Sequence, residues 1–98
     1  MAKSQSVHNF IESVFLRPRM YTLTGSYAEV VAFLTGYYSG IAKERSRLQE
    51  TVWTSFCIWL AHEMGTSTAE VFEILYAQYQ DKSLDVLVSL YHKFNDIH

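Results

Sequence analysis

The sequence has one cysteine, one proline and four glycines among its 98 residues. The single thiol, Cys57, excludes an internal disulfide, and no group of cysteines and histidines has the spacing of a zinc site. No run of 18 apolar residues is present, and the first residues lack the apolar stretch of a signal peptide. These absences favour a reducing compartment. We expect a cytoplasmic protein with no membrane partner, no metal and no cofactor.

Charge is sparse and unevenly distributed. Residues 1–47 carry six basic and three acidic side chains, a net +3, whereas residues 48–98 carry two basic and seven acidic ones, a net −5. A nucleic-acid-binding protein normally presents a dominant basic face, so we expect no direct contact with nucleic acid. The acidic second half indicates either a surface for a basic protein partner or an ordinary solvated surface.

Apolar residues recur at helical spacing along most of the chain, and no segment has convincing strand character. With 49% apolar and 15% aromatic residues, the chain has enough hydrophobic surface to fold. The spacing predicts an all-α fold, a compact single-domain bundle of about five helices over residues 1–98. The predicted helical stripes cover residues 7–15, 27–41, 50–64, 71–79 and 84–94.

The helix predicted over residues 50–64 is apolar on most of its circumference, which is typical of a central helix. We expect its side chains Trp53, Phe56 and Leu60 to be buried. Gly65 stands where helices often end in a left-handed residue, so it predicts the end of this helix.

Other local signals mark helix boundaries. Pro18 disfavours helical geometry at the preceding residue and predicts the end of the first helix, followed by a loop over residues 21–25. The polar stretch 43–47 is either the end of the second helix or a charged connection. Two serine and glutamate pairs have the spacing of capping boxes and predict helix starts. These pairs are Ser26 with Glu29 and Ser67 with Glu70.

The second predicted helix carries small residues at four-residue spacing, Ala32, Gly36 and Gly40. Each glycine costs about 1 kcal/mol relative to alanine inside a helix, so some contact must offset that cost. The close approach of a neighbouring helix is one explanation, and the close approach of a partner is the other.

No arrangement of residues has the signature of an active site. His62 and Glu63 begin like a zinc-protease helix, but the position of the second histidine ligand holds Thr66. Cys57 lies on the apolar face of its predicted helix, where a thiol behaves as a small hydrophobe. No glycine-flanked nucleophile or phosphate-binding glycine loop occurs. We therefore expect a protein that is not an enzyme and has no catalytic residues.

The candidate site residues lie near one predicted hairpin. Glu70 and Glu73 sit one turn apart opposite an apolar stripe, and Asp81 and Asp85 follow at the break and in the next helix. We predict that these carboxylates and Tyr79 form a partner-binding surface, because tyrosine offers a large, stiff contact area with a polar tip. Favourable contact with helix N-termini is the alternative explanation for Glu70 and Asp85. The remaining tyrosines on or beside apolar stripes are expected to pack in the core, namely Tyr27, Tyr37, Tyr38, Tyr76 and Tyr91.

Residues 15–21, FLRPRMY, followed after a loop by residues 33–37, FLTGY, resemble a pattern of small all-helical immunity proteins in bacterial toxin systems, including contact-dependent growth inhibition. The resemblance covers residues 10–40. It implies a cytoplasmic protein that binds a cognate toxin domain, often a nuclease, and blocks its active site. We interpret the motif as scaffold, in which Pro18 and Met20 turn the chain and fill the core, and Arg17 binds helix-end carbonyls.

Two functions follow from these observations. The first is an immunity protein whose acidic surface covers the basic cleft of a toxin, which we expect to be a ribonuclease. The second is a non-enzymatic helical adaptor or regulatory module that binds another protein through the same surface. The neighbouring gene distinguishes them, because an immunity gene lies beside its toxin gene.

Overall fold

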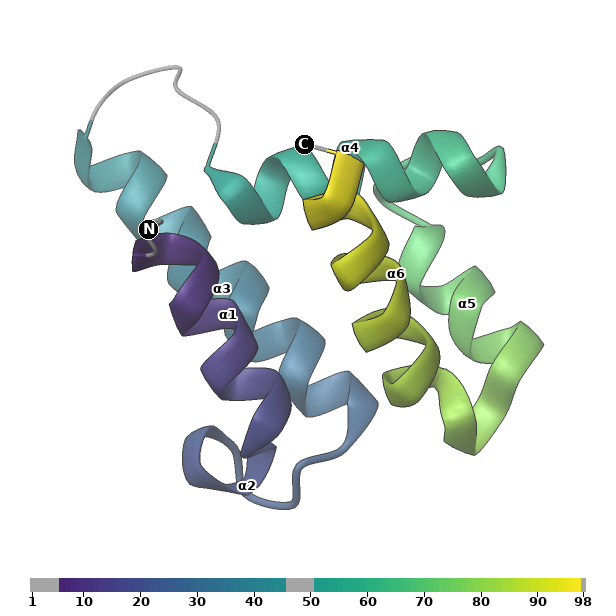
Figure 1. The fold of residues 1–98 in the computed structure, drawn as a ribbon, viewed down its shortest axis with the longest axis horizontal. Helices are drawn as coiled ribbons and strands as arrows, with labels where there is room; N and C mark the ends of the chain where they lie inside the picture. Colours follow the sequence, from purple (N-terminus) through teal and green to yellow (C-terminus); the bar gives the residue numbers. More distant parts are fainter. Residues whose placement is uncertain (1–5, 46–50, 98) are drawn as a thin grey trace. The chain divides into compact units, whose positions relative to one another are not determined.

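The structure, a computed structural model, describes residues 6–45 and 51–97, which form helices joined by short connections (Figure 1). No strand occurs among these residues, and the predicted all-α fold of about five helices is confirmed. Contacts divide the chain after Val52 into two units, and a single domain over residues 1–98 stays a prediction. The helices are α1 Ser6–Leu16, α2 Pro18–Tyr21, α3 Tyr27–Arg45, α4 Val52–Met64, α5 Val71–Tyr79 and α6 Ser83–Ile97, with a 3₁₀ turn, η1, at Gln80–Lys82.

Unit 1 contains α1, α2 and α3, and α1 contacts both of the others. One face of α1 and one face of α3 are buried, as the three- and four-residue spacing of their apolar side chains predicts. The stretch 43–45 belongs to α3, whereas residues 46–50 lie outside the described residues, as do the side chains of Val7 and Ile41. The buried members of the two stripes are Ile11, Val14, Phe15, Val30, Leu34 and Tyr38.

An aromatic cluster joins the three helices of unit 1. The ring centroid of Phe10 on α1 lies 5.7 Å from that of Tyr21 on α2 and 4.6 Å from that of Tyr37 on α3. Phe33 and Tyr38, also on α3, lie 6.2 and 6.5 Å from Phe10. Ring pairs at these separations contribute about 0.5–1.5 kcal/mol each beyond their area burial. The cluster therefore connects α1, α2 and α3 in a chain that has no internal disulfide.

Pro18 ends α1 and also begins α2. Its ring sits at the start of the short helix, where a fixed φ is favourable and a missing N–H costs nothing. Two interpretations of the surrounding motif are wrong. The Met20 side chain is exposed and does not fill the core. The Arg17 guanidinium Nη1 lies 3.9 Å from Met20 Sδ instead of binding a helix-end carbonyl of the described residues.

The predicted capping box at the start of α3 forms only in part. The Ser26 hydroxyl accepts a hydrogen bond from the Glu29 N–H at 3.2 Å, as predicted. The Glu29 carboxylate turns to the preceding loop, where it accepts from the Thr24 N–H at 2.7 Å, the Thr24 hydroxyl at 2.9 Å and the Gly25 N–H at 3.2 Å. Gly25 has a φ of 76°, which glycine adopts without strain. These hydrogen bonds hold the pKa of Glu29 below its ordinary value, the Thr24 N–H having the largest effect.

Unit 2 contains α4, α5 and α6, and its core forms around Phe56. This ring is fully buried and meets Tyr91 and Phe94 of α6 edge-on, with centroids 5.2 and 5.5 Å away. Trp53, one turn before Phe56 on α4, stacks on Phe72 of α5 at 5.8 Å with an interplanar angle of 8°. Aromatic contacts thus connect α4 to both other helices. The predicted burial of Trp53, Phe56 and Leu60 is confirmed.

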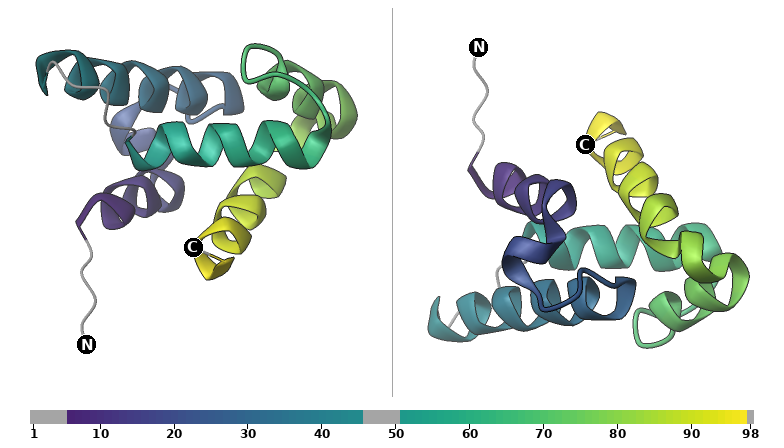
Figure 2. Two further views of the ribbon diagram at one scale, coloured as in Figure 1. Left: turned by 90° about the horizontal axis from the view of Figure 1, so that it is seen from above. Right: turned by 90° about the horizontal axis from the view of Figure 1, so that it is seen from below.

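The helices α5 and α6 form a hairpin. They meet at η1 and run in opposite directions from it (Figures 1 and 2). Gln80, the first residue of the turn, has a φ of 54°, which allows the chain to reverse within three residues. The buried Ser83 hydroxyl donates a hydrogen bond to the Leu75 carbonyl at 3.5 Å and so links the two helices.

The end of α4 was predicted correctly. Gly65 has a φ of 69°, and its N–H donates to the His62 carbonyl at 3.2 Å. The Thr66 N–H donates to the Ala61 carbonyl at 2.9 Å, which completes a Schellman motif.

The capping box predicted for Ser67 and Glu70 is wrong. A turn follows Ser67, α5 begins only at Val71, and the side chain of its N-cap, Glu70, makes no cap hydrogen bond. The Ser67 carbonyl instead accepts from the N–H groups of Glu70 and Val71, at 3.2 and 3.0 Å. Backbone hydrogen bonds therefore satisfy donors that a capping side chain would otherwise bind.

The small residues of α3 do not pack against α1 or α2, the other helices of unit 1. Ala32, Gly36 and Gly40 are exposed, and a Cβ added at either glycine would meet no atom within 4 Å. The explanation by a closely packed neighbouring helix is therefore wrong.

Leu60→Ala should destabilise the protein by about 2–5 kcal/mol, because Leu60 is fully buried and its loss leaves a cavity. Chemical denaturation followed by circular dichroism measures the change. Ile58→Ala, two positions away on the exposed side of α4, is the matched control and should change stability by less than about 0.5 kcal/mol. Equal midpoints for the two variants would contradict the assignment of this core.

Glu29→Gln should lower the melting temperature at pH 7, because the charged carboxylate accepts three hydrogen bonds in the folded state. A carboxyl group whose folded pKa is depressed stabilises the protein above its unfolded pKa, and this contribution disappears as the pH falls through the folded value. The difference in melting temperature between the variant and the wild type should therefore shrink as the pH falls from about 5 to about 3, because the ordinary carboxyl pKa is about 4.3. Thermal melts across this range test it, with Glu63→Gln as the control. A pH-independent difference would contradict the assigned role.

Candidate functional site

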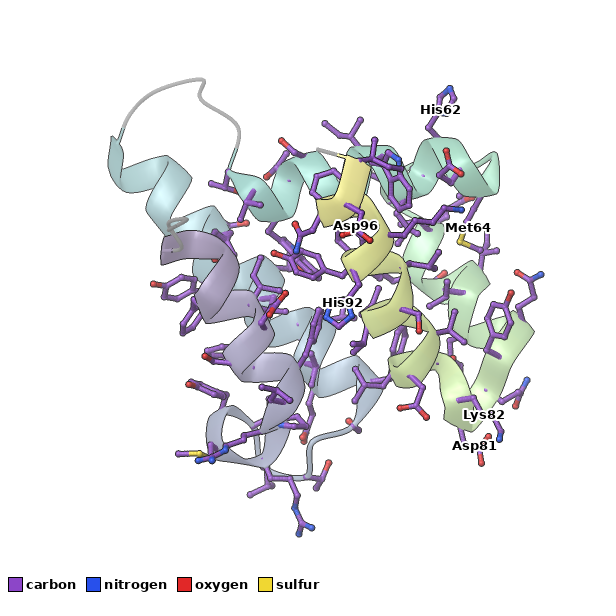
Figure 3. The ribbon with its side chains drawn as sticks, in the orientation of Figure 1. His62, Met64, Asp81, Lys82, His92 and Asp96 are labelled. Atoms are coloured by element: carbon purple, nitrogen blue, oxygen red, sulfur yellow. The ribbon has the colours of Figure 1, made fainter. Side chains whose placement is uncertain are left out.

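All five predicted site residues lie on the α5–α6 hairpin and are exposed. Glu70 is the N-cap of α5 and Glu73 lies in its first turn, whereas Asp81 lies in η1 and Asp85 in the first turn of α6. Figure 3 shows Asp81 beside Lys82 at the turn of the hairpin. The nine residues of α5 make a helix about 14 Å long at 1.5 Å per residue, with Glu70 before its first residue and Asp81 after its last. The carboxylates therefore form one pair at each end of α5.

A row of exposed side chains connects the two ends of α5. Glu70, Glu73, Tyr76 and Tyr79 follow one another at three-residue spacing, which makes each one a neighbour of the next along a line that winds half a turn around the helix. We call these four residues the α5 row. Tyr76 is 50% exposed and Tyr79 is 40% exposed. The α5 row thus presents two carboxylates followed by two phenol rings.

Tyr76 was expected in the core, and this expectation is wrong. The buried face of α5 consists of Val71 and Leu75, and Tyr76 lies about 100° around the helix from Leu75. The sequence does contain a signal for this exposure, because Tyr76 lies three residues from both Glu73 and Tyr79 and is therefore their neighbour on the helix surface. Tyr37 on α3 is 43% exposed and was also placed wrongly, whereas Tyr38 and Tyr91 were placed correctly, because both are buried.

The four carboxylates are available to a partner. Within residues 6–45 and 51–97, none of their side chains has an ion pair or a hydrogen bond. Lys82 is the only basic residue between Glu70 and Asp85 in the sequence. The hairpin therefore presents negative charge whose field is complementary to a cationic surface. The helical backbone fixes the positions from which these side chains extend.

The groups considered for catalysis or metal binding do not assemble. Among the described residues, no three histidine, cysteine or acidic side chains are placed to hold one metal ion. His62 is exposed and points away from α4 (Figure 3). Cys57 is partly buried, and desolvation raises the pKa of its thiol to about 12, so the reactive thiolate is scarce at neutral pH.

Two further observations bear on function. In the part of the chain that the structure describes, no helix has the length and hydropathy needed to cross a bilayer. Comparisons with known protein families, with curated proteins and with solved structures gave no match. The arguments for function therefore rest on the residues of this chain.

Cys57 should react slowly with a thiol reagent, because burial disfavours its thiolate. Its reaction with Ellman's reagent at pH 8 should be at least about tenfold slower in the folded protein than in denaturant. The absorbance of the released thiol measures both rates. Equal rates would show that Cys57 is an accessible thiol of ordinary reactivity, and a faster reaction in the folded protein would show an activated thiol.

Proposed function

We propose that this protein is an immunity protein that binds and neutralises a cognate bacterial toxin domain. The proposed toxin is a ribonuclease with a basic active-site cleft, and the α5–α6 hairpin covers that cleft with its acidic surface. The observation that carries the proposal is the α5 row, in which two exposed carboxylates are followed along α5 by two exposed tyrosine rings. The resemblance of residues 15–21 and 33–37 to immunity proteins supports the toxin as the class of partner.

Charge complementarity explains how the α5 row would inhibit such an enzyme. A ribonuclease holds RNA phosphates with positive side chains in its cleft, and carboxylates can occupy the same positions. Glu70 and Glu73 would meet these cations, and the negative field would accelerate encounter at low salt. Tyr76 and Tyr79 would supply contact area next to the charges, since tyrosine loses little conformational freedom on binding. Inhibition would then follow from exclusion of RNA, with no chemistry by this protein.

The second candidate is a helical adaptor or regulatory module. The distribution of the carboxylates along α5, which is about 14 Å long, favours it, because an extended basic segment along this helix could contact both pairs. An adaptor and an immunity protein would use the same residues, and the identity of the partner distinguishes them.

Changing Glu70, Glu73, Asp81 and Asp85 together to lysine should abolish protection against the toxin encoded beside this gene. The wild-type protein should let cells survive expression of that toxin, because its carboxylates occupy the cleft. Growth after toxin induction and inhibition of purified toxin on an RNA substrate are the measurements. Circular dichroism must show that the variant retains its helices.

A matched pair of double variants controls for net charge. Glu70→Lys with Glu73→Lys alters the α5 row, whereas Glu63→Lys with Asp96→Lys makes the same charge change on α4 and α6, at exposed sites outside the row. Figure 3 shows Asp96 away from the turn that holds Asp81. Protection should fall only with the first pair. Full protection by a folded α5-row variant would contradict the proposed surface, and a harmless neighbouring gene product would favour the adaptor.

A further inference from the structure

The three most exposed large hydrophobic side chains of the described residues lie within eight positions of one another. Leu23 is 86% exposed, Leu16 is 80% exposed and Met20 is 68% exposed. They come from the end of α1, from α2 and from the loop that follows, at one end of unit 1 (Figure 1). A soluble surface normally scatters such side chains singly, and a concentration of them marks an interaction site.

Two arginines accompany these side chains. Arg17 and Arg19 are exposed, and residues 13–28 contain no acidic residue. The Arg17 guanidinium lies beside the Met20 sulfur at 3.9 Å. We call the set Leu16, Arg17, Arg19, Met20 and Leu23 the α2 tip. It combines exposed apolar side chains with two positive charges, and the Glu29 carboxylate beside it accepts hydrogen bonds from Thr24 and Gly25 of the adjoining loop.

Local hydrogen bonds define the backbone of the α2 tip before any partner binds. The Thr22 N–H and hydroxyl both donate to the Pro18 carbonyl at 2.9 Å, which closes α2. The Thr22 hydroxyl in turn accepts from the Gly25 N–H at 2.9 Å. A Cβ at Gly25 would lie 2.8 Å from Arg19 Cγ, so glycine leaves room for the arginine stem. Binding would therefore require little ordering of this backbone.

We propose that the α2 tip is a peripheral binding site for an anionic phospholipid surface. Leucine and methionine side chains can enter the boundary between headgroups and acyl chains, while the guanidinium groups bind lipid phosphates at the surface. Exposed apolar side chains together with exposed guanidinium groups are complementary to an anionic bilayer, which presents phosphates at its surface and acyl chains beneath them.

This proposal replaces the expectation that the protein has no membrane partner. That expectation rested on the lack of a spanning segment, whereas peripheral binding needs only exposed apolar groups and basic charge. The α2 tip lies in unit 1 and shares no residue with the α5 row. The lipid proposal therefore does not depend on the proposed immunity function.

Sedimentation with vesicles tests the proposal on the full chain. The protein should sediment with phosphatidylcholine vesicles that contain about 30% phosphatidylserine, and less so in high salt. Pure phosphatidylcholine vesicles should bind it much more weakly. Arg17→Gln with Arg19→Gln should lower the partition coefficient about 25-fold, at about fivefold, or ~1 kcal/mol, for each charge near the surface. Leu16→Ser with Leu23→Ser should reduce binding to both vesicle types.

Matched variants separate the α2 tip from nonspecific effects. Lys82→Gln with Lys93→Gln removes the same charge from exposed positions in unit 2, and Ile58→Ser with Ile97→Ser removes exposed apolar groups there. Both should bind like wild type, and thermal melts should show that every variant is folded. Three results would overturn the proposal. The first is no sedimentation with anionic vesicles, which is also the result expected if the tip binds only an acidic protein. The second is equal binding to neutral vesicles. The third is unchanged binding by the folded arginine variant.

Discussion

The burial of the Phe56 ring between α4 and α6 is the contact on which unit 2 depends. Its edge-on neighbours, Tyr91 and Phe94, connect α4 to α6. The stacked pair of Trp53 and Phe72 connects the same face of α4 to α5. These aromatic contacts hold α5 by one side, which leaves the opposite side, with its carboxylates, available to a partner. The proposed binding surface is thus a consequence of how the core is packed.

Aromatic contacts between other residues hold the helices of unit 1 together. A unit of about fifty residues has little interior, and such small units often need a disulfide or a metal. The single cysteine excludes the first of these within the chain. Instead, Phe10 contacts rings from both α2 and α3, and the Glu29 carboxylate ties the connecting loop to the start of α3. Aromatic packing and one hydrogen-bonded carboxylate together define the loop that displays the α2 tip.

The α2 tip and the α5 row have opposite charge, because the first half of the sequence is net basic and the second half is net acidic. The α2 tip contains Arg17 and Arg19 and no acidic residue, and the α5 row contains Glu70 and Glu73 and no basic residue. One surface suits an anionic layer and the other suits a basic protein. The two surfaces share no residue, so substitutions in one of them leave the residues of the other unchanged.

The sequence by itself determined the features that depend on nearby residues. Helical periodicity, the break at Pro18, the Ser26 cap and the left-handed Gly65 all follow from backbone sterics and local hydrogen bonds. It also located the acidic hairpin, since residues three to four apart share a helix face. The start of α5 was missed because backbone groups around Ser67 satisfy one another without its side chain.

Only the tertiary structure decided which residues at the edges of each apolar stripe are buried by a neighbouring helix. Helical spacing predicted Tyr76 in the core and the interpretation of the Pro18 motif predicted Met20 there, yet both are exposed, and the space beside Gly36 is open. Periodicity gives the direction of a side chain around its helix, but the width of the buried face depends on which neighbouring helices cover it. Exposure of Tyr76 completes the α5 row, and exposure of Met20 creates the α2 tip. One residue of each proposed surface is therefore one whose exposure the local pattern does not determine.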